Sequence, residues 1–87
     1  MRSHVSARFR KCFGELPEPV QERARKAYRL FAENPSHPSL RFKQLHANEP
    51  IMSVRVGLGY RALGVMHRDD IIWFWIGSHA DYDRLVR

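Results

Sequence analysis

The sequence predicts an α+β fold in which two N-terminal helices pack on one face of a small antiparallel β-sheet. Up to Asn34 the apolar residues recur at helical spacing, whereas from Ile51 onward they alternate or run without interruption, as in strands. A chain of 87 residues can build one hydrophobic core but not two. Residues 1–87 are therefore expected to form a single domain.

The two predicted helices occupy the first 34 residues. The first ends at Leu16-Pro17 and carries an apolar stripe at i, i+3, i+4 and i+7, made of Phe9, Cys12, Phe13 and Leu16. The second accepts Pro19 in its first turn and ends at Asn34-Pro35. Its apolar face consists of Val20, Ala24, Ala27, Tyr28 and Phe31. Its other face carries Arg23, Arg25, Lys26 and Arg29, which form either a solvated surface or a nucleic-acid-binding strip.

Three strands are predicted in the C-terminal half, at residues 51–56, 60–67 and 71–76. In the first, apolar residues alternate with Ser53 and Arg55, so one face should be buried and the other should offer a polar row. The third is apolar at every position and therefore belongs inside the sheet. A weak N-terminal strand is expected around residues 3–7. Residues 40–50, after a proline-containing loop, form either an edge strand or an extended arm, and residues 79–87 form a short helical turn or an extended end.

Composition points to a polyanionic partner. Fifteen Lys and Arg oppose nine Asp and Glu, and twelve of the cations are Arg, whose planar guanidinium binds phosphate in a bidentate manner. RNA is the expected partner, although Arg could also be simply the preferred surface cation. The single cysteine, Cys12, indicates a reducing cytoplasm, and the chain has no apolar run of the roughly 20 residues that a membrane span needs. No Cys/His pattern has zinc spacing, so neither a metal nor a cofactor is expected.

Five residues are candidates for catalysis. Arg55 and Arg61 lie on neighbouring strands beside the turn at residues 57–59, where they could hold one phosphate, and His79 follows the last strand with Tyr82 and Asp83 within one turn. A ribonuclease that activates the ribose 2′-hydroxyl needs a proton acceptor, a proton donor and fixed positive charge, which histidine and arginine supply without a metal.

Each candidate also has a structural interpretation. The two arginines could be ordinary exposed strand residues, and His79 could cap the last turn. Tyr60, Trp73 and Trp75 are expected to pack the sheet rather than stack on bases, and His37, His46 and His67 are expected in loops or turns.

Residues 52–65 and 72–83 resemble the C-terminal half of the RelE/ParE toxin superfamily. The sequence Ile-Gly-Ser-His-Ala-Asp-Tyr-Asp at residues 76–83 is similar to the signature of its HigB-like branch. The resemblance implies a RelE-like fold and the toxin of a bacterial type II toxin–antitoxin system, an endoribonuclease that cleaves mRNA in the 70S ribosomal A site without a metal. It also implies an antitoxin whose arm could cover the basic sheet face or displace the terminal turn.

The resemblance also implies residue roles. Arg55 and Arg61 would hold phosphate, His79 would act as general acid or base, Tyr82 would support it, and Asp83 would orient it. Arg41 and Lys43 are further candidates for RNA binding.

The sequence departs from the family pattern at two points. Some relatives carry a lysine where this chain has Ser53, and others use an acidic base; Glu49 is nearby but is not assigned that role. A ParE-type inhibitor of DNA gyrase and a non-catalytic RNA-binding relative therefore remain alternatives. The combination of His79, Tyr82 and Asp83 favours the nuclease.

Overall fold

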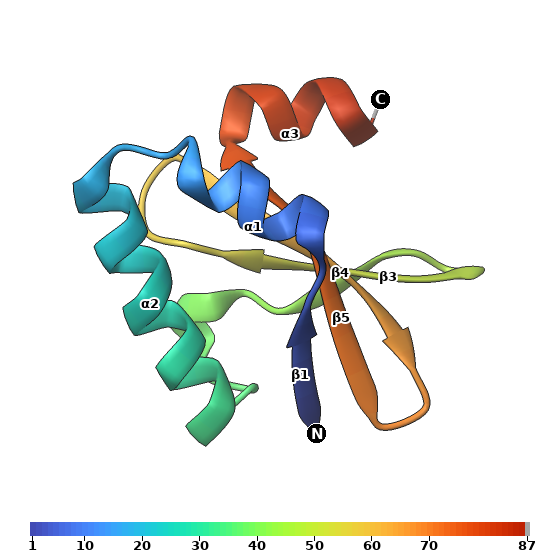
Figure 1. Ribbon diagram of the computed structural model, residues 1–87. Coiled ribbons are helices and arrows are strands. Elements are labelled where there is room, and N and C mark those ends of the chain that lie inside the picture. The colour runs from blue at the N-terminus through green and yellow to red at the C-terminus, as the bar shows by residue number, and fades with distance from the viewer. Residues whose placement is uncertain (87) are drawn as a thin grey trace.

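One five-stranded sheet organises the chain, with strand order β1-β5-β4-β3-β2 and three helices packed around it (Figure 1). The computed structural model describes residues 1–86. The elements are β1 (Arg2–Val5), α1 (Ala7–Gly14), α2 (Glu18–Glu33), a 3₁₀ turn (Pro38–Leu40), β2 (Lys43–His46), β3 (Glu49–Arg55), β4 (Tyr60–His67), β5 (Asp70–Ser78) and α3 (His79–Val86). The predicted α+β class, with two N-terminal helices on a small sheet, is confirmed.

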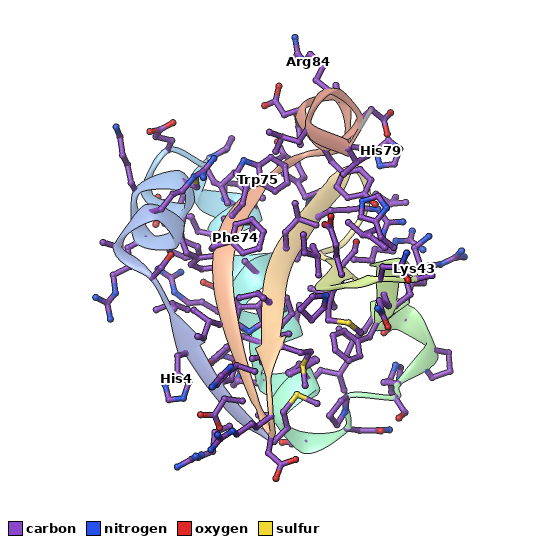
Figure 2. All side chains as sticks on the ribbon, turned by 90° about the vertical axis from the view of Figure 1, so that its right-hand side faces the viewer. His4, Lys43, Phe74, Trp75, His79 and Arg84 are labelled. Atoms are coloured by element: carbon purple, nitrogen blue, oxygen red, sulfur yellow. The ribbon has the colours of Figure 1, made fainter. Side chains whose placement is uncertain are left out.

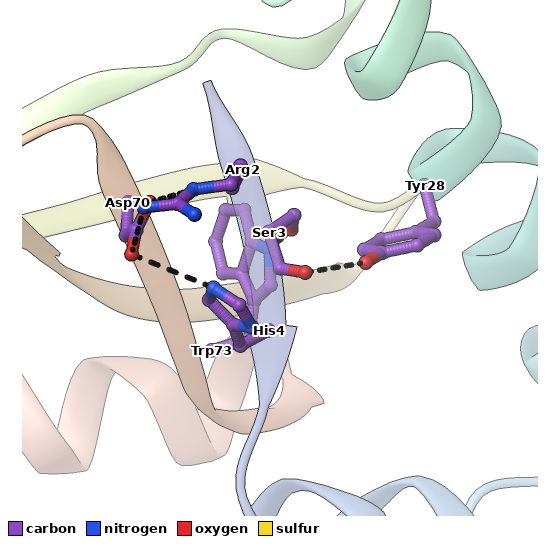
Figure 3. Close-up of polar contacts among 6 residues, drawn as sticks. All are labelled: Arg2, Ser3, His4, Tyr28, Asp70 and Trp73. Carbon is purple, nitrogen blue, oxygen red and sulfur yellow. Dashed lines mark hydrogen bonds and ion pairs between the residues drawn. The ribbon is translucent and has the colours of Figure 1, made fainter.

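The N-terminal strand makes the sheet mixed rather than purely antiparallel. Strands β3, β4 and β5 pair antiparallel as predicted, and β2 also pairs antiparallel with β3, but β1 lies parallel to β5 at the edge of the sheet. Side chains hold it there, because the indole Nε1 of Trp73 donates to Ser3 Oγ at 2.7 Å and Arg2 pairs with Asp70 at 2.8 Å (Figure 3). The apolar strand β5 thus lies inside the sheet, between β1 and β4, as its sequence predicted.

Two segments that the sequence left open are now assigned. Residues 43–46 form an edge strand rather than an extended arm, and β3 begins at Glu49, two residues earlier than predicted, because His46 pairs with Glu49. Residues 79–86 form a helix, α3, rather than an extended end; Arg87 lies outside the described residues. No helix within residues 1–86 has the length and apolar character to cross a membrane.

A β-bulge in β5 sends its two tryptophans to opposite faces of the sheet. Leu63 pairs with Trp75 but Gly64 pairs with Trp73, so Phe74 is the extra residue. Trp73, 3% exposed, packs edge-on against Phe31 of α2, at 5.3 Å between ring centroids. Trp75, 8% exposed, packs with Leu63 on the other face, beneath α3. The predicted packing role of both tryptophans is confirmed.

The predicted polar row on β3 is wrong at Ser53. This serine is 0% exposed, because Lys43 and Leu63 are its cross-strand neighbours and the side chain of Arg61 is hydrogen-bonded to it. Arg55, two residues further along the same face, is partly exposed. The face opposite α1 and α2 is therefore apolar beneath α3 and becomes polar and cationic where β3 and β4 meet at their turn.

Candidate functional site

An open cleft of about 410 Å³ lies where the turn at residues 57–59 joins β3 to β4 and where β5 passes into α3. Its lining consists of Arg41, Arg55, Gly57, Gly59, Tyr60, Arg61 and His79. Four of the residues selected from the sequence, three arginines and the histidine, thus share one cleft. Lys43, Tyr82 and Asp83 do not line it.

The β3–β4 hairpin and α3 are tied together at this cleft. Arg55 and Arg61 are cross-strand partners, so their side chains leave the same face of the sheet. Gly57 and Gly59 adopt φ values of 64° and 83°, which glycine reaches without steric cost. The Gly59 carbonyl then accepts a hydrogen bond from the backbone N–H of His79 at 2.7 Å. This contact brings the first residue of α3 against the turn, 20 residues away in sequence.

Arg61 is held on two sides. Its Nη1 donates to Ser53 Oγ at 3.2 Å, and its Cζ lies 5.3 Å from the centroid of the Tyr82 ring, within cation–π range. Tyr82 itself is 7% exposed and packs on Leu63 and Trp75. Within residues 1–86, no carboxylate forms an ion pair with any of the arginines that line the cleft. Their positive charge is thus available to an external anion.

The side chain of His79 is exposed to solvent and also packs against Tyr82. Its side chain is 54% exposed, and its ring stacks on Tyr82 at 5.8 Å between centroids and 25° between planes. Its Nε2 lies 3.6 Å from Asp83 Oδ2 one helical turn later, a contact longer than a normal hydrogen bond. Figure 2 shows His79 at the base of α3, with Lys43 lower on the same side of the molecule. The imidazole therefore lines the cleft and is accessible to solvent.

Two further residues raised by the sequence lie outside the cleft. Lys43 is exposed on the edge strand β2, opposite Ser53. Glu49 is exposed at the far end of β3, six residues from Arg55, or about 20 Å along a strand. Glu49 is therefore too distant to act as a base in this cleft.

The remaining histidines and helical cations have separate structural surroundings. His37 Nδ1 accepts from the backbone N–H of Ser39 at 3.2 Å, and His4 Nε2 lies 3.6 Å from Asp70 (Figure 3). On α2, Arg25 lies over the ring of Phe13 and pairs with Glu22 at 3.4 Å, which favours the solvated-surface interpretation for that residue. Within residues 1–86, no group of three or more His, Cys, Asp or Glu side chains is arranged to hold a metal ion.

Sequence reasoning missed Ser53. Its position on an alternating strand placed it on the face that was expected to be solvated. The neighbouring arginine-bearing strand was a signal that the face is polar, but burial of the hydroxyl depends on the side chain of Arg61 and on the cross-strand neighbours Lys43 and Leu63.

The fold is that of the RelE/ParE toxins. The chain superposes on RelE in the RelB-RelE antitoxin-toxin complex from Methanococcus jannaschii with a TM-score of 0.74 at 19% identity, covering 93% of this chain and 96% of that one. It matches YafQ from E. coli with a TM-score of 0.73 at 12% identity, over 94% and 98% of the two chains. For the YoeB/ParE toxin from Agrobacterium tumefaciens the TM-score is 0.70 at 10% identity, over 91% and 99%. Identities this low demonstrate a shared fold alone.

The family is defined by the sequence itself. Residues 18–84 match the ParE-like toxin domain, and the chain belongs to that family. No curated protein sequence is significantly similar to the chain. The resemblance to the RelE/ParE superfamily found in the sequence is thereby confirmed.

Proposed function

We propose that this protein is the toxin of a bacterial type II toxin–antitoxin system and acts as an endoribonuclease on mRNA. The observation that carries the proposal is the cleft that Arg61 and His79 share with Arg41 and Arg55. Three guanidinium groups without carboxylate partners favour a phosphodiester, and an exposed imidazole beside them can transfer a proton.

The reaction uses the nucleophile that RNA itself carries. The 2′-oxygen attacks the adjacent phosphorus, the 2′-hydroxyl proton leaves to a base, and the bond from phosphorus to the 5′-oxygen breaks as that oxygen takes up a proton. The products are a 2′,3′-cyclic phosphate and a 5′-hydroxyl. His79 gives or takes one of these protons, Arg61 and Arg55 stabilise the negative charge that develops on the phosphorane, and Arg41 contacts a neighbouring phosphate. DNA lacks the 2′-hydroxyl and is not cleaved.

We place this activity on the ribosome, in the 70S A site, as the likeness to the HigB-like signature implies, and in the cytoplasm. A net charge of +6 suits a polyanionic ribosomal surface, because phosphate contacts by Lys and Arg supply most non-specific binding to nucleic acid. Lys43, which is exposed on β2 and pairs with Ser53, would add a contact of this kind outside the cleft.

A cognate antitoxin is the second proposed partner. The RelE proteins from Methanococcus jannaschii and Pyrococcus horikoshii were each solved in complex with RelB. In this chain an open, apolar groove of about 360 Å³ lies between α1, α2 and the sheet, on the face opposite Arg61. Among residues 1–86, the charged residues that line it are Arg10, Arg25 and Arg29. An amphipathic helix with an apolar face and flanking carboxylates fits this groove.

The test is inducible expression of the wild type beside Arg61→Ala and His79→Ala, with growth measured and mRNA ends mapped. Growth arrest accompanied by cuts within reading frames, seen in the wild type alone, would support the proposal. Arrest by all three with DNA damage and no cuts would indicate gyrase inhibition, and no arrest by any would indicate a degenerate relative.

A further inference from the structure

We propose that Ser53 is a positioning residue that orients the guanidinium of Arg61 toward the scissile phosphate. The inference rests on the proposed function and assigns a role in it to a side chain outside the cleft lining. Ser53 is the only buried polar or charged residue within residues 1–86, and it is 0% exposed. A hydroxyl at such a position is costly unless it is hydrogen-bonded.

The partner of this hydroxyl is Arg61. Nη1 of Arg61 donates to Ser53 Oγ at 3.2 Å, and this is the one hydrogen bond that the guanidinium makes within residues 1–86. A guanidinium has five N–H donors, so the contact leaves the remaining donors free for a phosphate. A carboxylate at residue 53 would also hold Arg61, but it would neutralise the guanidinium and compete with the phosphate. A serine holds the arginine and leaves its charge intact.

Arg61 needs such an anchor because of its neighbours. Arg55 is its cross-strand partner and Arg41 lines the same cleft, so like charges surround it. Repulsion favours side-chain rotamers that point into solvent, where an arginine has many conformations. The Ser53 hydroxyl at one end of the guanidinium and the Tyr82 ring beneath it restrict Arg61 to one orientation before substrate binds.

The decisive variant is Ser53→Ala, which removes a single oxygen and leaves the packing of β3 intact. We expect kcat/KM for cleavage of an mRNA substrate to fall roughly 10- to 100-fold, with most of the loss in kcat, because Arg61 keeps its charge but loses its alignment. Ser3→Ala is the matched control. Its hydroxyl also accepts a hydrogen bond from a side-chain N–H, that of Trp73, but it lies on β1 and does not contact the cleft. Ser3→Ala should leave kcat unchanged.

Two measurements separate positioning from stability and do not depend on catalysis. In ¹⁵N NMR spectra, the Nη groups of Arg61 should show slow rotation in the wild type and in Ser3→Ala, and averaged signals in Ser53→Ala. Binding of a 2′-deoxy oligonucleotide analogue should weaken in Ser53→Ala, whereas adding Ser53→Ala to Arg61→Ala should weaken it no further.

The inference is overturned if Ser53→Ala leaves both the Arg61 signals and kcat unchanged, or if it weakens analogue binding equally with and without Arg61. A wild type that cleaves no RNA would refute the proposed function instead. In that case the NMR and binding comparisons still decide whether Ser53 orients Arg61 toward an anion.

Discussion

The ring of His79 stacks on the ring of Tyr82, with centroids 5.8 Å apart, and the same tyrosine ring lies 5.3 Å from the guanidinium carbon of Arg61. One buried aromatic side chain therefore supports both residues to which we assign the chemistry. Because α3 supplies His79 and Tyr82 whereas β4 supplies Arg61, the docking of α3 on the sheet sets their relative position.

Removal of the Tyr82 ring should cost both stability and activity. Tyr82→Ala deletes a buried ring that packs on Leu63 and Trp75, and we expect the free energy of unfolding to fall by roughly 3–5 kcal/mol in urea titrations. Tyr82→Phe keeps the ring and should retain most of the cleavage rate. A large loss of kcat in a stable Tyr82→Phe protein would instead give the hydroxyl a direct chemical role.

Substitution of His79 should greatly slow cleavage and leave the fold intact. The side chain is exposed and contributes little buried area, so His79→Ala should unfold at nearly the wild-type urea concentration. The rate of cleavage should fall by about 10²- to 10⁴-fold, the usual contribution of a general acid or base. Asp83→Asn is the comparison, and its effect should be much smaller because the 3.6 Å contact is too long for a strong hydrogen bond.

Removal of a positive charge that lines the cleft should affect RNA binding more than removal of one outside the lining. Arg41 lines the cleft and adopts φ 47°, whereas Lys43 is exposed on β2 outside the lining. For binding to single-stranded RNA at several salt concentrations, Arg41→Ala should reduce the slope of log K against log salt by about 0.7, the value for one lost phosphate contact. Lys43→Ala removes the same charge and should change the slope less. Equal changes would show that net charge alone drives binding.

Close packing against Trp75 should make Gly77 intolerant of a side chain. A Cβ at Gly77 would lie 2.5 Å from Cζ2 of the indole, whereas a Cβ at Gly14 would meet nothing within 4 Å. Gly77→Ala should therefore destabilise the protein by roughly 1–3 kcal/mol, and Gly14→Ala should leave its stability equal or slightly higher. Thermal denaturation of the two variants provides the comparison. A neutral Gly77→Ala would mean that Trp75 can move aside without cost.

The apolar groove should govern antitoxin binding independently of cleavage. Ala27 lines the groove between α1 and α2, and a carboxylate there would repel an acidic partner helix. Ala27→Glu should thus weaken neutralisation by the cognate antitoxin while growth arrest by the toxin persists. Arg61→Ala should show the reverse behaviour, with loss of toxicity and unchanged antitoxin affinity in titration calorimetry. If both variants bind antitoxin normally, the antitoxin docks elsewhere, such as on the basic sheet face.

Local pattern in the sequence determined the two N-terminal helices, the three strands of the C-terminal half and the placement of Arg55 and Arg61 on neighbouring strands, because apolar periodicity and a glycine turn act over a few residues. The sequence also identified His79 as a candidate for catalysis, but it did not place this residue relative to the arginines.

Only the tertiary structure decided the rest. The bulge at Phe74 makes Trp73 and Trp75 point to opposite faces of the sheet. The parallel pairing of β1 with β5 joins residues about 70 apart in sequence. The hydrogen bond from the His79 N–H to the Gly59 carbonyl brings His79 to the cleft. Burial of Ser53 likewise depends on which elements meet. Such contacts arise from packing between distant segments, which no local periodicity encodes.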